Sequence, residues 1–267
     1  MGKARLAVIG GTGFEDPALL GRPTQTQLVE TRFGSASVSF YAIRGETVAF
    51  LSRHGPSHTI PPHGVNYRAN IAALASIGVE RVVSTAAVGS LRRELAPGTV
   101  VVVDQFLDFT RQRPFTFFDG DTPGACVVHT DFTEPYCPEV RARLLEAARS
   151  EKLAVRPSGC YVGLEGPRYE SAAEVRAFAM LGGDVVGMTG LPEAVLAREA
   201  GLCFATVAVV TNLGAGLSGA PLSHREVEQA MASLRPRVLK IMLEAILALP
   251  AERHCPCANV PGRGLVR

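Results

Sequence analysis

The sequence carries little charge and lacks any long apolar run. Charged residues make up 19% of its 267 positions, and the formal net charge is only +2. This balance gives no reason to expect nucleic acid or a membrane surface as a partner. Apolar runs such as residues 100–103 are too short to span a bilayer, and the N-terminus lacks a signal peptide's long apolar segment. We therefore expect a cytoplasmic protein without nucleic-acid or membrane partners.

A zinc-binding cysteine pattern is also lacking. Four of the six cysteines are scattered along the chain: Cys126, Cys137, Cys160 and Cys203. An ordinary buried thiol is the expectation for each. Cys255 and Cys257 lie in a polar tail that contains proline and glycine, where a passive tail is favoured over a labile disulfide or a reactive pair. No metal site is expected.

Internal repeats and low-complexity linkers are absent before residue 250, and 47% of the residues are hydrophobic, enough for a full core. Strand and helix patterns alternate along the chain without a break. This alternation predicts a single α/β domain over residues 1–250, with a central mixed β-sheet flanked by helices. Residues 251–267 are expected to form a C-terminal tail.

The first predicted strand, residues 5–9, runs into the glycine turn GGTGFED. This turn is not a dinucleotide fingerprint, because the third glycine would fall at Asp16 and Pro17 follows. A glycine turn after a strand presents backbone N–H groups to an anion. For Thr12 we favour contact with phosphate over a plain tight turn.

Two further predicted strands end in motifs suited to ligands. Residues 38–43 and 47–52 are predicted to form a hairpin, and Arg53 and His54 follow at the carboxyl end of its second strand. Open α/β sheets place ligand groups at such ends, and both side chains offer charge-assisted donors to phosphate. The strand at residues 81–85 runs into AAVGS, predicted to be a small-residue turn that lets backbone approach a ligand.

The segment EGPRYES at residues 165–171 combines a backbone break with a cation (Arg168), an aromatic ring (Tyr169) and a carboxylate (Glu170). Gly-Pro forces a turn, and the ring next to the carboxylate suits a purine. A solvated turn is the alternative. Thr189 and Asn212 also follow predicted strands, at residues 184–188 and 203–211, and a turn asparagine is the alternative for Asn212.

Several of these motifs, in this order, resemble the trimeric purine nucleoside phosphorylase and methylthioadenosine phosphorylase family. The resemblance extends from residue 10 to about residue 249, and its frame is closest to the methylthioadenosine branch. The motifs are GGTG, RHG, NYRAN, GSL, DQFLDFT, EGPRYE, GMTGLPE and the TN after the long strand. Agreement of so many separate turns is far more specific than any single one.

The resemblance implies phosphorolysis of a ribosyl purine to ribose 1-phosphate and free base. Inorganic phosphate is then the co-substrate, no metal or organic cofactor is needed, and the chain forms a homotrimer or a dimer of trimers. Packing against a second subunit would also explain the phenylalanine-rich loop at residues 108–121. By family position, the residues that hold phosphate would be Thr12, Arg53, His54, Thr189 and the backbone N–H of Ala86. Met188 would pack under the ribose and Tyr169 would cover the purine.

The sequence departs from the methylthioadenosine pattern at the positions that set base specificity. Adenine-specific members have aspartate at the positions of Asn212 and Gly214, serine at Glu170 and threonine at Ala86. A carboxylate at Glu170 accepts the N1–H of a 6-oxopurine, and Asn212 donates to N7. Glu170 and Asn212, acting directly on the base, therefore predict inosine and guanosine as substrates.

The 5′ end of the substrate is the second specificity question. His224 aligns with the histidine that meets the 5′-hydroxyl in 6-oxopurine phosphorylases, and a solvent-facing residue at a helix start is the alternative. His129 resembles the region that reaches into a neighbouring subunit's 5′ pocket. A methylthioinosine or methylthioadenosine phosphorylase is the alternative enzyme. A hydrolytic nucleosidase and a catalytically silent purine-binding protein are more distant alternatives.

Overall fold

The structure, a computed structural model, describes residues 2–14, 20–55, 58–120, 127–218 and 224–260, without the side chains of residues 224–230 and 233. Its strands are β1 (Leu6–Gly10), β2 (Gln25–Thr31), β3 (Gly34–Ile43), β4 (Glu46–Ser52), β5 (Arg81–Ser90), β6 (Val100–Val102), β7 (Gln105–Asp108), β8 (Val155–Arg156), β9 (Cys160–Gly163), β10 (Val185–Gly187) and β11 (Cys203–Leu213). Its helices are α1 (Tyr67–Ser76), α2 (Pro138–Ser150), α3 (Ala172–Met180), α4 (Glu193–Glu199) and α5 (His224–Leu247), with short 3₁₀ turns η2 (Pro62–Gly64) and η3 (Pro256–Asn259).

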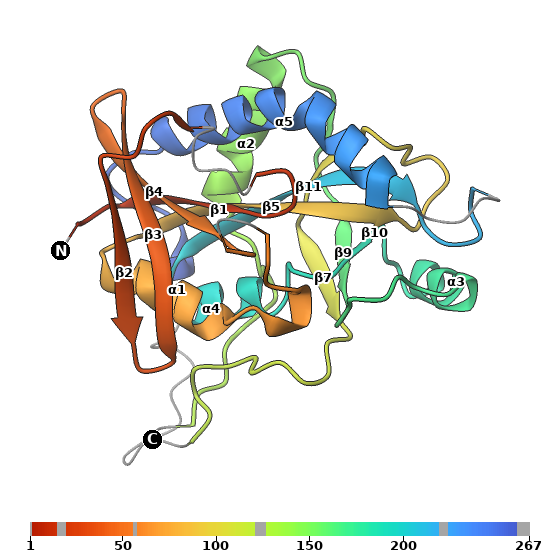
Figure 1. Ribbon diagram of the computed structural model, residues 1–267, viewed down its shortest axis with the longest axis horizontal. Helices are drawn as coiled ribbons and strands as arrows, with labels where there is room; N and C mark the ends of the chain where they lie inside the picture. The colour runs from red at the N-terminus through yellow and green to blue at the C-terminus, as the bar shows by residue number, and fades with distance from the viewer. Residues whose placement is uncertain (1, 15–19, 56–57, 121–126, 219–223, 261–267) are drawn as a thin grey trace.

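Within the described residues, eleven strands form one mixed sheet (Figure 1). The main path runs β2-β3-β4-β1-β5-β10-β9-β7, while β11 pairs with β5 and β6, and β6 pairs with β8. β5 is the centre, since β1 and β11 run parallel to it and β10 runs antiparallel. The predicted single α/β domain with a mixed central sheet is confirmed.

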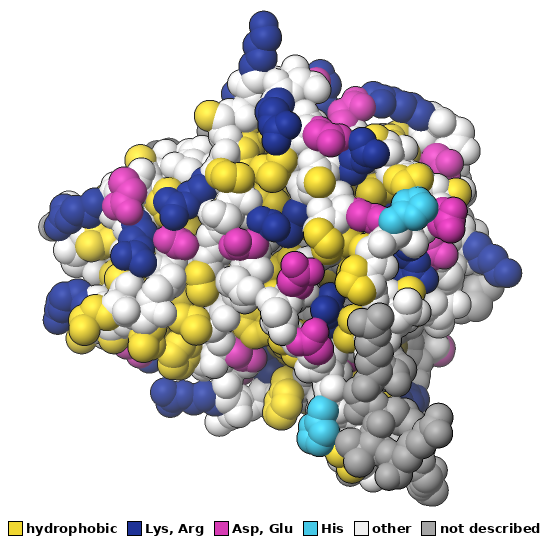
Figure 2. All heavy atoms as spheres, turned by 180° about the vertical axis from the view of Figure 1, so that it is seen from behind, with side chains coloured by type: hydrophobic (Ala, Val, Ile, Leu, Met, Phe, Trp, Pro, Cys, Tyr) yellow, Lys and Arg dark blue, Asp and Glu magenta, His cyan; other side chains and the backbone are white. Residues whose placement is uncertain are grey.

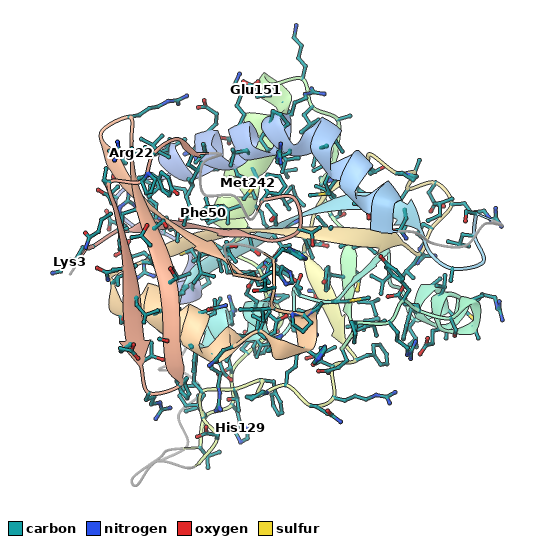
Figure 3. All side chains as sticks on the ribbon, in the orientation of Figure 1. Lys3, Arg22, Phe50, His129, Glu151 and Met242 are labelled. Atoms are coloured by element: carbon teal, nitrogen blue, oxygen red, sulfur yellow. The ribbon has the colours of Figure 1, made fainter. Side chains whose placement is uncertain are left out.

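Helices cover both faces of this sheet (Figure 1). On one face α2 and α5 bury a cluster that includes Leu144 and Met242, together with Phe50 from β4 (Figure 3). On the other face α1 and α4 pack their own cluster, with Ile71 and Leu196 completely buried. Because the central strands are covered on both faces, they consist of nearly continuous apolar runs.

Of the predicted local elements, the hairpin is confirmed and one turn is wrong. The predicted hairpin turns at Arg44 and Gly45, both with positive φ, as two-residue hairpin turns require. α3 begins with a capping box between Ser171 and Glu174. The predicted small-residue turn at residues 86–90 is wrong, because β5 continues to Ser90 and pairs with β11 over that stretch.

The C-terminal segment differs from the expected passive tail. Arg81 donates hydrogen bonds to the carbonyls of Ala251 and Glu252, and Arg253 donates to the Gly201 carbonyl. Cys255 and Cys257 are buried in the core cluster under α2 and α5. Residues 251–260 are therefore packed onto the domain, and three of these contacts are made by backbone carbonyls, which leave no sequence signal.

The surface agrees with the near-neutral composition. On the face seen from behind, basic and acidic side chains are interspersed with apolar ones (Figure 2). In the described part of the chain, no helix is long and apolar enough to cross a membrane.

Candidate active site

A cavity of about 350 Å³ lies in the middle of the sheet, within the usual size for a small-molecule site. Its walls come from segments that are far apart in sequence. The lining residues are Thr12, His54, His58, Pro62, Ala87, Val88, Gly89, Pro167, Tyr169, Glu170, Val186, Gly187, Met188, Thr189, Thr211 and Asn212. Seven of the predicted site residues are thus brought together: Thr12, His54, Tyr169, Glu170, Met188, Thr189 and Asn212.

The cavity exists because the partner of β5 changes along one edge. β1 pairs with β5 only as far as Ser84, and β10 pairs with it from Gly89 onward. Among the described ladders, residues 85–88 therefore have no strand on that edge. β10 is antiparallel to β5, so the chain leaving β1 and the chain leaving β10 enter this gap from opposite sides. Such a point of divergence is where α/β sheets bind ligands.

Thr12 and His54 line the cavity from the β1 and β4 side. The Gly11 N–H donates to Thr85 Oγ1 at 2.9 Å, which holds the loop after β1 against β5. Burial, and then the charge of Arg53, lowers the pKa of His54 to about 4. His54 is therefore neutral near pH 7, not the charged donor expected from the sequence. Its Nδ1–H donates to the Ile60 carbonyl at 2.8 Å, so Nε2 is left as an acceptor.

Arg53 does not line the cavity, in contrast to its predicted direct contact with phosphate. Its side chain is fully buried, and its Nε and Nη2 groups donate to the Glu193 carboxylate at 2.9 and 2.7 Å. Nη2 also donates to Ser84 Oγ at 2.6 Å, and Nη1 donates to the Thr85 carbonyl at 3.1 Å. A side chain at Gly11 would collide with this guanidinium. Arg53 thus supports the cavity indirectly, by holding Ser84 and Thr85 of β5 beside it.

The side chain of Ala86 is 1% exposed and belongs to the core cluster on the α1 and α4 side. The neighbouring Ala87 lines the cavity. Since side chains alternate between the two faces of a strand, these two alanines point to opposite faces of β5. The expected contact of phosphate with the backbone N–H of Ala86 stays a prediction.

Thr189 and Met188 enter the gap from β10. The hydroxyl of Tyr161, on β9, accepts the N–H groups of Thr189 and Gly190 at 3.2 and 3.0 Å. Tyr161 is completely buried, so this turn is fixed from beneath. Thr12 and Thr189 therefore reach one cavity from the two halves of the sheet, with two hydroxyls and the turn of a glycine loop available to an anion.

Tyr169 and Glu170 come from the loop after β9. The Glu165 carboxylate in that loop accepts the backbone N–H of Arg111 at 2.7 Å, and Arg113 donates to the Leu164 carbonyl at 3.2 Å. The phenylalanine-rich loop therefore braces the loop after β9 within the same chain. Glu170 is 7% exposed, and burial raises the pKa of its carboxyl above the ordinary value.

Asn212 faces the cavity because β11 contains a bulge. Its register against β5 shifts between Val210 and Asn212, so the consecutive residues Thr211 and Asn212 both line the cavity. Thr211 Oγ1 donates to Asn212 Oδ1 at 2.9 Å. The amide oxygen is thereby turned toward Thr211, while Nδ2 donates to the Leu213 carbonyl at 3.1 Å and retains a second N–H.

The two predicted 5′-end residues do not line this cavity. His129 is exposed on the segment after β7 and borders a separate hollow with Asp131 and Arg198 (Figure 3). His224 begins α5, but its side chain lies outside the described part of the structure.

Sequence reasoning missed the residues that support the wall. Ser84, Tyr161 and Glu193 act through buried contacts. A carboxylate near a helix start has an ordinary local explanation, so burial was the missing signal. His58, whose ring packs 4.4 Å from that of His54, also had no motif to single it out.

These features define the class of protein. A mixed α/β sheet that collects hydroxyl, imidazole, carboxylate and amide groups in one cavity at a point of strand divergence is typical of an enzyme acting on a small polar molecule. More particularly, residues 5–248 match the model of the Phosphorylase superfamily, and the chain belongs to that family.

Relatives cover nearly the whole chain. It is 50% identical to the 6-oxopurine nucleoside phosphorylase of Pyrococcus furiosus over 258 residues, 96% of this chain and 97% of that one. It is 43% identical to the probable S-methyl-5′-thioinosine phosphorylase of Methanopyrus kandleri over 255 residues, 95% and 96% of the two chains. Among solved structures, methylthioadenosine phosphorylase from Schistosoma mansoni in complex with adenine superposes with a TM-score of 0.90 at 32% identity, covering 98% and 97%.

The buried Arg53–Glu193 pair generates a prediction about stability. Glu193→Ala leaves the guanidinium buried without its carboxylate and should lower the free energy of unfolding by about 3–5 kcal/mol. Urea denaturation measures this loss. The control is Glu146→Ala, which removes an exposed ion pair with Arg143 and should cost less than about 1 kcal/mol. Equal losses in the two variants would contradict a supporting role for the buried pair.

Proposed function

We propose that the protein catalyses phosphorolysis of 6-oxopurine nucleosides, with inosine and guanosine as substrates. The observation that carries this proposal is that Glu170 and Asn212 face one cavity together with Tyr169. A carboxylate, an amide and an aromatic ring there match the two polar edges and the flat face of a 6-oxopurine. The Pyrococcus furiosus relative, named for activity on 6-oxopurine nucleosides, supports the same substrate class.

Recognition of the base depends on complementary hydrogen bonds. The ionised Glu170 carboxylate accepts N1–H, which 6-oxopurines have and adenine lacks. Asn212 uses its remaining Nδ2–H to donate to N7, since Thr211 holds the amide oxygen away. Because the pKa of Glu170 is raised by burial, this recognition weakens as the pH falls through that pKa.

The reaction transfers a ribosyl group from the base to phosphate. A phosphate oxygen forms a bond to C1′ while the C1′–N9 bond breaks, and its electron pair leaves with the purine. Asn212 stabilises the departing base at N7, and Met188 lies under the sugar. Phosphate itself supplies the nucleophile, so we propose that neither a metal nor an organic cofactor takes part in the reaction. The protein contributes positioning and fixed dipoles.

The phosphate subsite in this proposal lies between Thr12 and Thr189. Neutral His54 accepts a hydrogen bond from a protonated phosphate oxygen, since its Nδ1–H is used by Ile60. Arg53 acts from behind by holding Ser84 and Thr85, and its positive charge attracts the anion without a salt bridge at the surface of the cavity.

The rival enzyme differs at the 5′ end of the substrate. Glu170 and Asn212 suit inosine and methylthioinosine equally, because both carry the same base. The Methanopyrus kandleri relative, named for S-methyl-5′-thioinosine, makes this rival specific. We retain His224, and His129 from a neighbouring subunit, as the proposed partners of the 5′ group.

Base release from inosine, guanosine, adenosine, methylthioinosine and methylthioadenosine, each with and without phosphate, tests the function. We expect phosphate-dependent release from inosine and guanosine, with kcat/KM about 10⁴-fold or more above that for adenosine. Faster release from methylthioinosine would favour the rival. Release without phosphate would indicate a nucleosidase, and no release would favour a binding protein.

The specificity of Asn212 makes a separate prediction. Asn212→Asp should lower kcat/KM for inosine and raise it for adenosine, because a protonated acid near N7 and the 6-amino group favours adenine. Asn259→Asp, at an exposed position, is the control and should change neither value. Parallel changes for both nucleosides would show that Asn212 is only structural.

We also propose that the chain assembles as a homotrimer or a dimer of trimers. Phe115 and Val127 are 61% and 60% exposed, and both lie after β7 and before the exposed His129. Such exposed apolar groups are typical of an interface. Sedimentation equilibrium should give three or six times the 28.3 kDa chain mass, and a monomer at micromolar concentration would contradict this proposal.

A further inference from the structure

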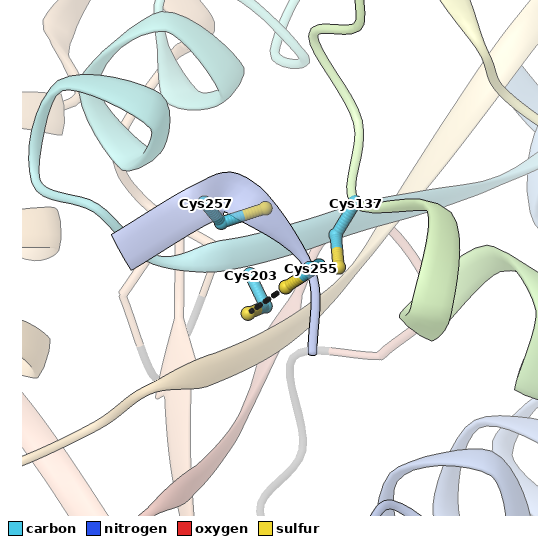
Figure 4. A group of neighbouring side chains, drawn as sticks. All are labelled: Cys137, Cys203, Cys255 and Cys257. Atoms are coloured by element: carbon cyan, nitrogen blue, oxygen red, sulfur yellow. Dashed lines mark hydrogen bonds between the residues drawn. The ribbon is translucent and has the colours of Figure 1, made fainter. Parts of the chain in front are cut away.

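Four cysteines that are distant in sequence meet in the core (Figure 4). Cys137 precedes α2, Cys203 begins β11, and Cys255 and Cys257 lie at η3 in the C-terminal segment. Their four Sγ atoms lie within 4.8 Å of one another, and all four side chains are buried. Cys203 Sγ and Cys255 Sγ are 3.3 Å apart.

We propose that these four cysteines form a structural zinc site. A tetrahedral zinc tetrathiolate has Zn–S bonds of about 2.3 Å, which place its sulfur atoms about 3.8 Å apart. The 3.3 Å separation of Cys203 and Cys255 and the 4.8 Å limit on all pairs lie on either side of that value, so Zn²⁺ fits after small movements of the thiols. Binding forms four Zn–S bonds and releases four protons from the thiols to solvent, with no change in oxidation state.

The surroundings of the cluster suit a site with net negative charge. Zn²⁺ with four thiolates carries two negative charges, which burial would penalise without nearby cations. Arg198, 4% exposed, approaches Cys257 Sγ with its Nη1 at 3.9 Å. The Arg198 guanidinium thus compensates part of the charge of the site.

The arrangement favours metal binding over two disulfides. A disulfide joins one sulfur to one other, so two disulfides need two separate pairs and an oxidant that accepts four electrons in all. Here each sulfur lies near all three others, as metal ligands do. Cys255 is the N-cap of η3 and Cys257 lies within it, so both thiols are presented from one short turn.

The site lies away from the catalytic cavity. Cys203 is the first residue of β11, whereas Thr211 and Asn212 lie at its other end. β11 has 11 residues, and at about 3.3 Å per residue its ends are roughly 30 Å apart. Zinc there would hold the C-terminal segment to α2 and β11 and would stabilise the folded state only.

Metal analysis of the whole chain tests this proposal. The reduced protein is incubated with Zn²⁺ and freed of unbound metal by gel filtration. Its bound zinc is then measured by inductively coupled plasma mass spectrometry. We expect about one zinc per chain, and removal by a strong chelator should lower Tm by at least about 5 °C. Co²⁺ in place of zinc should show the absorption of a tetrahedral thiolate site.

Variants separate the cluster from other thiols. Cys137→Ser and Cys257→Ser should each reduce bound zinc at least tenfold, whereas Cys160→Ser, outside the cluster, should retain it. If the cluster variants do not fold, the stoichiometry and the cobalt spectrum of the unmodified chain decide the matter. Zinc below about 0.1 per chain after reconstitution overturns the proposal. An intact mass that shows disulfides resistant to mild reduction overturns it as well.

Discussion

The buried ion pair between Arg53 and Glu193 is the constraint on which the cavity depends. It joins the end of β4 to the start of α4, and through Ser84 and Thr85 it reaches the stretch of β5 that has no strand partner on one edge. A charged pair without access to water must keep all its partners, so these segments have one arrangement relative to each other. The open edge of β5 is preserved because the buried pair fixes the end of β4 and the start of α4 relative to β5.

One cavity collects residues from both halves of the sheet. Thr12 and His54 come from the parallel half, and Tyr169, Glu170, Met188 and Thr189 come from the half that is antiparallel to β5. The proposed phosphate subsite therefore takes Thr12 from one half and Thr189 from the other, where the two halves meet at β5. Hydrogen bonds with Tyr161 and Arg113 fix the loop after β10 at Gly190 and Leu191. The lining residues Met188 and Thr189 are therefore held in position next to the cavity.

The proposed active site and the proposed zinc site lie at opposite ends of β11. Its carboxyl end carries Thr211 and Asn212 in the cavity, and its amino end carries Cys203 among the clustered thiols. The C-terminal segment joins only the second of these. Substitutions in residues 251–260 can therefore alter the stability of the domain while the cavity keeps its lining.

The sequence by itself determined the α/β class, the family resemblance, the hairpin turn and seven residues of the cavity, because turns and strand ends are local signals. Only the tertiary structure decided that the Arg53 side chain is buried outside the cavity and that Thr211 joins Asn212 through a bulge. It also decided that Cys137, Cys203, Cys255 and Cys257 meet. These outcomes depend on strand register and burial, which arise from pairing between segments distant in sequence, and a register shift of one residue reverses which side chains face the ligand.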